Sequence, residues 1–181
     1  MGVMDDFEKY IPATYAAMRE TGLLLGSVGS DGKPNLMTIG WGLIGVMWGK
    51  PVFMVAVRPG RYTHRLIEES GEFTVNMPSR EMSEACMICG TVSGRDVDKF
   101  EKTGLKWRRG DLVGAPVVEG CPIVYECRVL YKDSVKLQML PGDMVEAIYP
   151  RRDAHALYYG EILKIHGKLN LQFNFLGREV S

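Results

Sequence analysis

The feature that most limits the fold of this chain is an uninterrupted apolar run, PVFMVAV, at residues 51–57. Valine and phenylalanine favour extended backbone, and an apolar run without alternation is typical of a strand buried on both faces. Pro51 bounds the run on one side and Arg58-Pro59-Gly60 bounds it on the other, which confines it to strand length. We therefore predict that residues 51–57 form a strand in the centre of a sheet.

Further strand patterns lie before and after this run. Residues 22–28 (GLLLGSV) and 35–41 (NLMTIGW) flank the glycine-rich turn GSDG, which predicts a β-hairpin. Turns are expected at Pro141-Gly142 and Gly167-Lys168. The remaining strand-like segments are residues 73–76, 121–135, 143–149 and 156–166.

Helical patterns occupy the middle of the chain. Tyr62, Leu66 and Ile67 share one helical face, and Gly71 is placed to end that helix. A second helix is expected over 79–89 and a third over 96–102, each followed by a glycine. Hairpin-like turns around a helical insert predict a fold that is mostly β with helical insertions, in one domain spanning residues 1–181.

The charge balance argues against two classes of partner. Lys plus Arg and Asp plus Glu both number 22, so no global positive field favours a nucleic acid or an anionic membrane. The longest uncharged stretch, residues 34–48, is too short and too rich in glycine to span a bilayer. Residues 1–12 carry acidic side chains and no apolar core, so we expect no secretory signal and a cytoplasmic protein.

Two familiar motifs do not hold in this context. Residues 40–45 match the spacing G-x-G-x-x-G, but Gly49 and Pro51 interrupt the helix that a dinucleotide site needs.

Cys86 and Cys89 have the spacing of a redox dithiol or of half a metal site. Within an amphipathic helix they are better interpreted as small core residues, and no metal site is predicted. His64, His155 and His166 lack mutual ligand spacing and are interpreted as surface or hydrogen-bonded residues.

Two loops have the composition of anion sites. The segment 58–63 (RPGRYT) leads from a buried strand directly into a helix, so free N–H groups and the helix dipole would face an anion. The segment 93–99 adds Gly94 and two cations one helical turn apart, Arg95 and Lys99. Each loop has an ordinary alternative, a basic turn in solvent for the first and a solvated helix start for the second.

Four segments in this order give the chain a family resemblance: 35–38 (NLMT), 57–63 (VRPGRYT), 73–76 (FTVN) and 89–100 (CGTVSGRDVDKF). Together they resemble the flavin reductase-like FMN-binding split-barrel family, in its flavoredoxin and ferric reductase branch. The resemblance runs from about residue 22 to the C-terminus. One departure is Gly49-Lys50-Pro51, where many relatives place two adjacent prolines.

The resemblance implies a Greek-key split β-barrel, a homodimer, and one FMN per subunit near the dimer interface. It implies no specific catalytic residue. The residues expected to contact FMN are Asn35, Met37, Thr38, Trp41, Arg58, Arg61, Tyr62, Thr63, Asn76, Ser93, Gly94, Arg95 and Lys99.

The function expected from the resemblance is an FMN-binding oxidoreductase. Electrons would pass from NAD(P)H or a reduced protein donor through FMN to free flavin, ferric complexes or a protein acceptor. The alternative is a non-enzymatic FMN-binding electron-transfer or flavin-sensing protein. A third hypothesis is a redox protein that uses Cys86 and Cys89.

Overall fold

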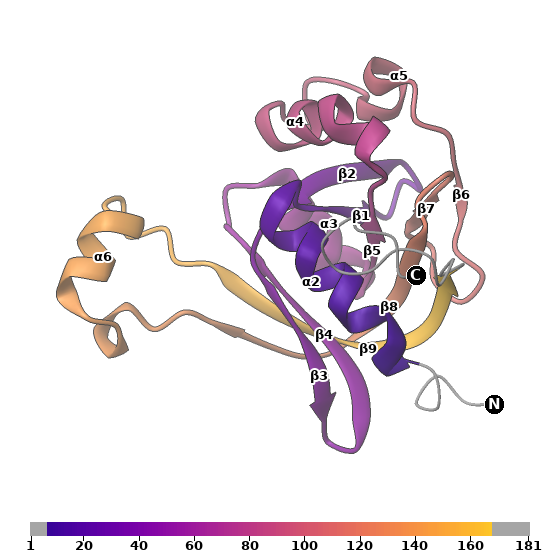
Figure 1. The fold of residues 1–181 in the computed structure, drawn as a ribbon. Helices are drawn as coiled ribbons and strands as arrows, with labels where there is room; N and C mark the ends of the chain where they lie inside the picture. Colours follow the sequence, from indigo (N-terminus) through magenta and orange to yellow (C-terminus); the bar gives the residue numbers. More distant parts are fainter. Residues whose placement is uncertain (1–6, 168–181) are drawn as a thin grey trace, which may run out of the picture.

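A computed structural model of the protein describes residues 7–167. Its main element is a seven-stranded, wholly antiparallel sheet in the order β2-β1-β5-β8-β9-β4-β3, beside a two-stranded sheet of β6 and β7 (Figure 1). The strands are β1 (Leu23–Val28), β2 (Pro34–Ile39), β3 (Gly42–Met47), β4 (Lys50–Val57), β5 (Glu72–Met77), β6 (Trp107–Arg109), β7 (Pro116–Val118), β8 (Ile123–Ser134) and β9 (Ala156–Gly167).

Helices cover the sheet on more than one side. α4 and α5 pack against β2, α3 packs against β1 and β2, and the Thr14 hydroxyl of α2 lies 2.6 Å from the Tyr125 hydroxyl of β8. Among the helices of residues 7–167, none is long and apolar enough to cross a membrane. The α-helices are α2 (Ile11–Glu20), α3 (Tyr62–Ser70), α4 (Ser83–Thr91), α5 (Lys99–Thr103) and α6 (Gly142–Ile148), and the 3-10 helices are η1 (Phe7–Tyr10), η2 (Arg80–Met82) and η3 (Leu137–Met139).

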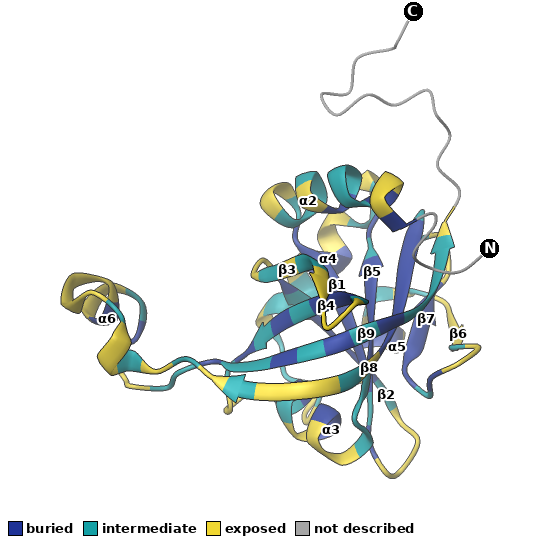
Figure 2. Cartoon of the chain, turned by 90° about the horizontal axis from the view of Figure 1, so that it is seen from below, coloured by how far each residue is buried: buried dark blue, intermediate teal, exposed yellow. Residues whose placement is uncertain are grey.

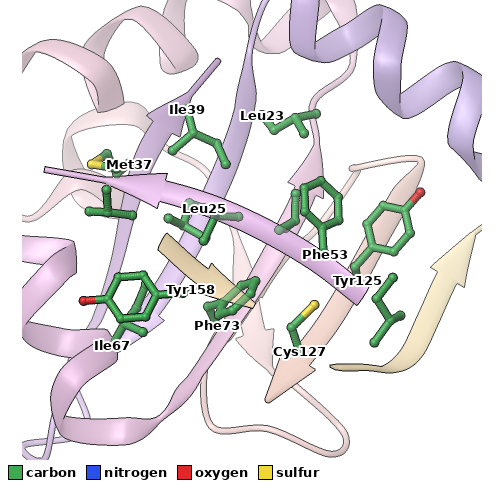
Figure 3. Close-up of a cluster of buried hydrophobic side chains, with 14 of the residues drawn as sticks. Leu23, Leu25, Met37, Ile39, Phe53, Ile67, Phe73, Tyr125, Cys127 and Tyr158 are labelled. Atoms are coloured by element: carbon green, nitrogen blue, oxygen red, sulfur yellow. The ribbon is translucent and has the colours of Figure 1, made fainter. Parts of the chain in front are cut away.

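Strand β1 is buried on both of its faces. Leu23 and Leu25 point into the larger hydrophobic cluster (Figure 3), whereas Leu24 points into a second cluster formed with α4 and α5. Strand side chains alternate between faces, so a strand with a core on each side must be apolar at consecutive positions. The sequence LLL therefore places β1 between two hydrophobic layers, and α4 covers the outer one.

The β-rich architecture and the first hairpin are confirmed, while several details differ from expectation. β4 is not central: it lies second from the edge, between β9 and β3. Residues 143–149 were expected to be extended, but 143–148 belong to α6 and Tyr149 is its C-cap, because Val145 and Tyr149 are buried at the helical spacing of four. α5 begins at Lys99 rather than at 96, since the Asp98 carboxylate caps its N-terminus. The turn expected at 167–168 lies partly outside the described residues, and so does the first half of the segment 1–12.

The sheet does not close into the expected barrel. β2 and β3 are consecutive in the chain, yet each lies at an outer edge of the seven-stranded sheet and they form no ladder with each other. The backbone turns away between them at Gly40 and Trp41, and only Ala56 N–H reaches back to the Trp41 carbonyl, at 3.4 Å. Gly40 and Trp41, where the two strands part, line the larger of the two cavities described below.

The hairpin of β3 and β4 ends in an exposed aromatic residue. Trp48 has a φ of 54° and Gly49 a φ of 70°, so both turn residues are left-handed, which is uncommon for a side chain as bulky as tryptophan. The Trp48 ring lies 5.8 Å from the ring of Tyr131 and 6.2 Å from that of Tyr159. These contacts hold the indole over β8 and β9.

A buried carboxylate fastens the loop between β6 and β7 to the sheet. Glu126 accepts hydrogen bonds from the backbone N–H groups of Asp111, Leu112 and Val113, and its Oε1 lies 2.5 Å from His166 Nε2. Burial raises the pKa of Glu126, but these hydrogen bonds outweigh it and the net pKa is lowered. A single carboxylate thus satisfies three backbone donors that the loop leaves unpaired.

We predict that Glu126→Gln destabilises the fold by about 2–4 kcal/mol, because several hydrogen bonds to a charged acceptor are lost. The folded pKa lies below the unfolded one, so this stabilisation is present above the unfolded pKa and is lost as pH falls through the folded value. Urea unfolding of both proteins at neutral and acidic pH measures this. An equal difference in stability between the two proteins at both pH values would contradict it.

Candidate functional site

Two neighbouring cavities lie beside β2 and share Met37 and Arg61 in their walls. The larger has a volume of about 170 Å³ and the smaller of about 120 Å³. The larger is lined by Met37, Thr38, Ile39, Gly40, Trp41, Ala56, Arg58, Arg61 and His155. The smaller is lined by Met37, Gly60, Arg61, Tyr62, Thr63, Val92, Ser93, Gly94, Arg95 and Lys99.

The wall between the two cavities is the turn that joins β4 to α3. Arg61 N–H donates to the Arg58 carbonyl at 3.0 Å, which closes the turn, and Arg61 occupies the N-cap position of α3 in extended conformation. No side chain caps this helix and its first turn holds no acidic residue. The first N–H groups of a helix lack intrahelical partners and carry partial positive charge, so this end of α3 favours an anion.

The second loop folds over this turn. Arg95 Nη1 donates to the Gly60 carbonyl at 3.1 Å, and its guanidinium carbon lies 5.4 Å from the centre of the Tyr62 ring. Gly94 lies directly against the Asn35 side chain, and a Cβ at this position would collide with Asn35 Oδ1. A larger residue would push the loop away from β2, so glycine is required here for close approach.

Lys99 is buried beside the smaller cavity. Its ammonium donates to the Leu36 carbonyl at 2.6 Å and to the Cys89 carbonyl at 2.8 Å, so it links β2 to the last turn of α4. It is therefore not a solvated helix residue paired with Asp96 or Asp98. Burial, which Cys89 opposes and the nearby positive charge of Arg61 reinforces, lowers the pKa of Lys99 to about 8.

The two arginines of the turn differ in what they contact. Arg58 ion-pairs with Asp153 at 2.6 Å and donates to the Ile148 carbonyl at 2.9 Å. The guanidinium group of Arg61 makes no hydrogen bond or ion pair with any residue between 7 and 167. The sequence did not distinguish the two guanidinium groups, whereas the structure leaves Arg61 as the one with its donors available to a ligand.

All the predicted contact residues except Asn35 and Asn76 line one of the two cavities. Asn35 lies just behind the wall, where its Nδ2 donates to Thr63 Oγ1 at 2.9 Å and its buried Oδ1 has no partner among the described residues. Asn76 is fully buried, donates to the Leu24 carbonyl and accepts from Val118 N–H. Nothing in this geometry brings Asn76 to the cavities.

The main residue that sequence reasoning missed is His155. It lies just before β9, lines the larger cavity, and its ring centre is 4.7 Å from that of Trp41. Its Nδ1 is 2.8 Å from the Tyr149 hydroxyl. No local motif signals this position, because the pairing of β9 with β4 is what brings His155 to a wall formed by residues from the first third of the chain.

The cysteines behave as the core residues that the sequence predicted. Cys86 and Cys89 are buried in the cluster between β1, β2 and α4. Burial raises the pKa of the Cys86 thiol to about 11 and also raises that of Cys89. Thiolates are the reactive form of cysteine, so this environment does not favour redox chemistry at the pair.

Comparison with known proteins gives one family and several related structures. Residues 18–178 match the family described as flavin reductase like domain. An uncharacterized protein of Archaeoglobus fulgidus is 34% identical over 136 residues, which cover 75% of this chain and 67% of that protein.

Two solved flavoredoxins share the fold. The flavoredoxin of Desulfovibrio vulgaris aligns with a TM-score of 0.66 and 27% identity, covering 88% of this chain and 76% of that one. The flavoredoxin from Methanosarcina acetivorans aligns with a TM-score of 0.63 and 30% identity, covering 87% of this chain and 73% of that one. Since the family match extends over most of the sequence, this chain belongs to the flavin reductase like domain family.

Proposed function

We propose that this chain binds FMN and transfers electrons through it. The observation that carries the proposal is the convergence of Arg61, Arg95 and Lys99 on one cavity at the N-terminus of α3. None of the described residues that line this cavity is acidic. Three cations and free helix N–H groups suit a phosphate monoester. The 27% and 30% identity to two flavoredoxins supports a flavin as the molecule that carries the phosphate.

The two cavities suggest how FMN would divide between them. Its phosphate would be held in the smaller cavity by Arg61 and by the N–H groups at the start of α3. Its ring system would extend toward the larger cavity, where Trp41 and Met37 offer apolar surface and Thr38 and His155 offer polar groups. The shared residues Met37 and Arg61 would lie at the passage from one part to the other.

Bound FMN would supply a ring system that accepts and releases electrons. The protein residues would bind, orient and shield it. Arg61 and Arg95 would neutralise the phosphate, Trp41 would exclude water from one side, and Lys99 would keep a positive charge close to the bound anion.

The reaction we propose takes electrons from NAD(P)H or a reduced protein and delivers them to free flavin, a ferric complex or a protein acceptor. Resemblance to flavoredoxins favours a second candidate, an electron carrier without turnover of its own. Anaerobic mixing of the FMN-loaded protein with NADH or NADPH separates the two. Rapid bleaching of the flavin absorbance supports the reductase, whereas bleaching by dithionite alone supports the carrier.

We predict that Arg61→Ala weakens FMN binding by roughly 10-fold to 100-fold, the loss expected for hydrogen bonds to a charged group. Riboflavin, which lacks the phosphate, should be affected little. Fluorescence titration with FMN, FAD and riboflavin measures the three affinities. The matched control is Arg65→Ala, because Arg65 is exposed on the same helix and pairs with Glu69. Equal weakening for FMN and riboflavin would remove phosphate recognition from the proposal.

FMN affinity should also fall as pH rises above about 8. The pKa of Lys99 is about 8 in the protein without FMN, and binding an anion beside it raises that pKa. The phosphate is already fully ionised there, since its second pKa is about 6. FMN titrations at about pH 7 and about pH 9.5 test this, because a lysine with the ordinary pKa of about 10.4 would remain mostly charged at both pH values. Lys99→Arg should show no such dependence, and a wild-type affinity constant across this range would count against the proposed role of Lys99.

We further propose that the protein is a homodimer and that the exposed edge strand β3 contributes to the interface. Leu43, Val46 and Met47 are large apolar residues of this strand that are exposed, and Trp48 in the following turn is exposed as well. An unpaired edge strand with an apolar surface is a ready site for association. A second copy is the expected occupant because the family resemblance implies a dimer.

Light scattering should therefore give a mass about twice 20.2 kDa. Val46→Glu places a charge on the exposed surface of β3 and should shift the protein toward the monomer. Met87→Glu is the control, since Met87 is equally exposed but lies on α4. A wild-type mass near that of one chain would exclude the dimer.

A further inference from the structure

The two longest strands extend into an arm that projects from the body. β8 and β9 are joined by residues 135–155, which hold η3 and α6 and reach away from the sheet (Figure 1). Most of the arm is exposed (Figure 2). Its buried residues are Val145, Tyr149 and, next to β9, His155. So exposed a segment needs contacts at its base to hold a fixed position relative to the body.

Arg58, at the end of β4, provides such contacts. Its Nη1 pairs with Asp153 Oδ1 at 2.6 Å, and its Nη2 donates to the Ile148 carbonyl at 2.9 Å. Its guanidinium carbon lies 5.2 Å from the centre of the Tyr149 ring. One side chain of the cavity wall therefore holds the end of α6, the residue after it and the segment that leads into β9.

The residues that Arg58 contacts also lie around His155. Tyr149, which packs on Arg58, places its hydroxyl 2.8 Å from His155 Nδ1, and the His155 ring stacks at a tilt on Trp41. The backbone N–H of Val135 donates to the His155 carbonyl at 2.9 Å. The second ring nitrogen, Nε2, makes no hydrogen bond within residues 7–167. His155, which lines the larger cavity, thus has one ring nitrogen engaged and the other without a partner among the described residues.

Charged groups face His155 from each element packed around it. Burial lowers the pKa of His155, the positive charges of Arg58 and Arg61 lower it further, and the Asp153 carboxylate acts in the opposite sense. Tyr149, the remaining titratable neighbour, forms the hydrogen bond to Nδ1. A neutral imidazole with one nitrogen engaged offers its other nitrogen as a single donor or acceptor.

We propose that Arg58 is a positioning residue that clamps the base of the arm and thereby sets the place and the charge of His155 in the wall of the larger cavity. Arg58 acts through Asp153 and Tyr149. If the proposed function holds, the available nitrogen of His155 meets a polar group of the flavin or of its electron donor. The clamp itself needs no ligand, so it is testable on the protein alone.

The experiment is an NMR titration of the histidine ring signals in ligand-free protein, with His155→Gln used to assign the His155 signal. Arg58→Gln should raise the His155 pKa, because it removes a positive charge and leaves Asp153 unpaired. Asp153→Asn should lower it. Arg58→Lys keeps the charge but cannot make both contacts at once, so backbone amide signals of the arm should shift as they do in Arg58→Gln.

Arg65→Gln, an exposed arginine on α3, is the matched control and should leave both the His155 pKa and the arm signals unchanged. Retained chemical-shift dispersion elsewhere shows that each variant is folded. An unchanged His155 pKa in both Arg58→Gln and Asp153→Asn would overturn the clamp. Failure of FMN binding in the titrations described above would remove the proposed function and leave this result standing.

Discussion

The burial of β1 on both faces is the constraint on which the rest of the structure depends. Leu23 and Leu25 need the main core on one side, and Leu24 needs a second apolar layer on the other. α4 and α5 supply that layer, and burying such a leucine contributes about 1.5–3 kcal/mol. Because α5 must pack there, the loop from Ser93 to Lys99 is brought over the turn at Arg61, and the smaller cavity forms between them.

The cations around the cavities differ in how far the protein's own groups satisfy them. Lys99 gives up bulk water and bonds to two carbonyl oxygens, which is acceptable because both acceptors carry partial negative charge. Arg95 lies on an aromatic ring and Arg58 is satisfied by the arm. Among these cations, only Arg61 keeps its side-chain donors free of residues 7–167, so the protein concentrates positive charge at a place where its own groups do not neutralise it.

Elements that depend on a few neighbouring residues could be predicted from the sequence. The run of residues 62–70 with Gly71 was predicted as a helix because its apolar spacing and its left-handed end are properties of a few neighbouring residues. Position within the sheet was not predictable in the same way, and β4 lies near the edge despite its apolar run. Residues 143–149 were mistaken for a strand because Val145, Ile148 and Tyr149 favour extended backbone, and only the burial of Val145 and Tyr149 at a spacing of four reveals the helix. His155 enters the site through a pairing between distant strands that no short motif records.

The place of β9 in the sheet has a consequence for the order of folding. β9 pairs with β8 on one side and with β4 on the other, and it is the final strand of the described chain. Until it pairs, β4 and β8 each present an open edge, and the wall of the larger cavity lacks His155. Contacts between segments far apart in sequence form slowly because the intervening chain must first be ordered. During synthesis the unfinished sheet is therefore exposed to association through these two edges, and insertion of β9 closes both edges and completes the cavity in one step.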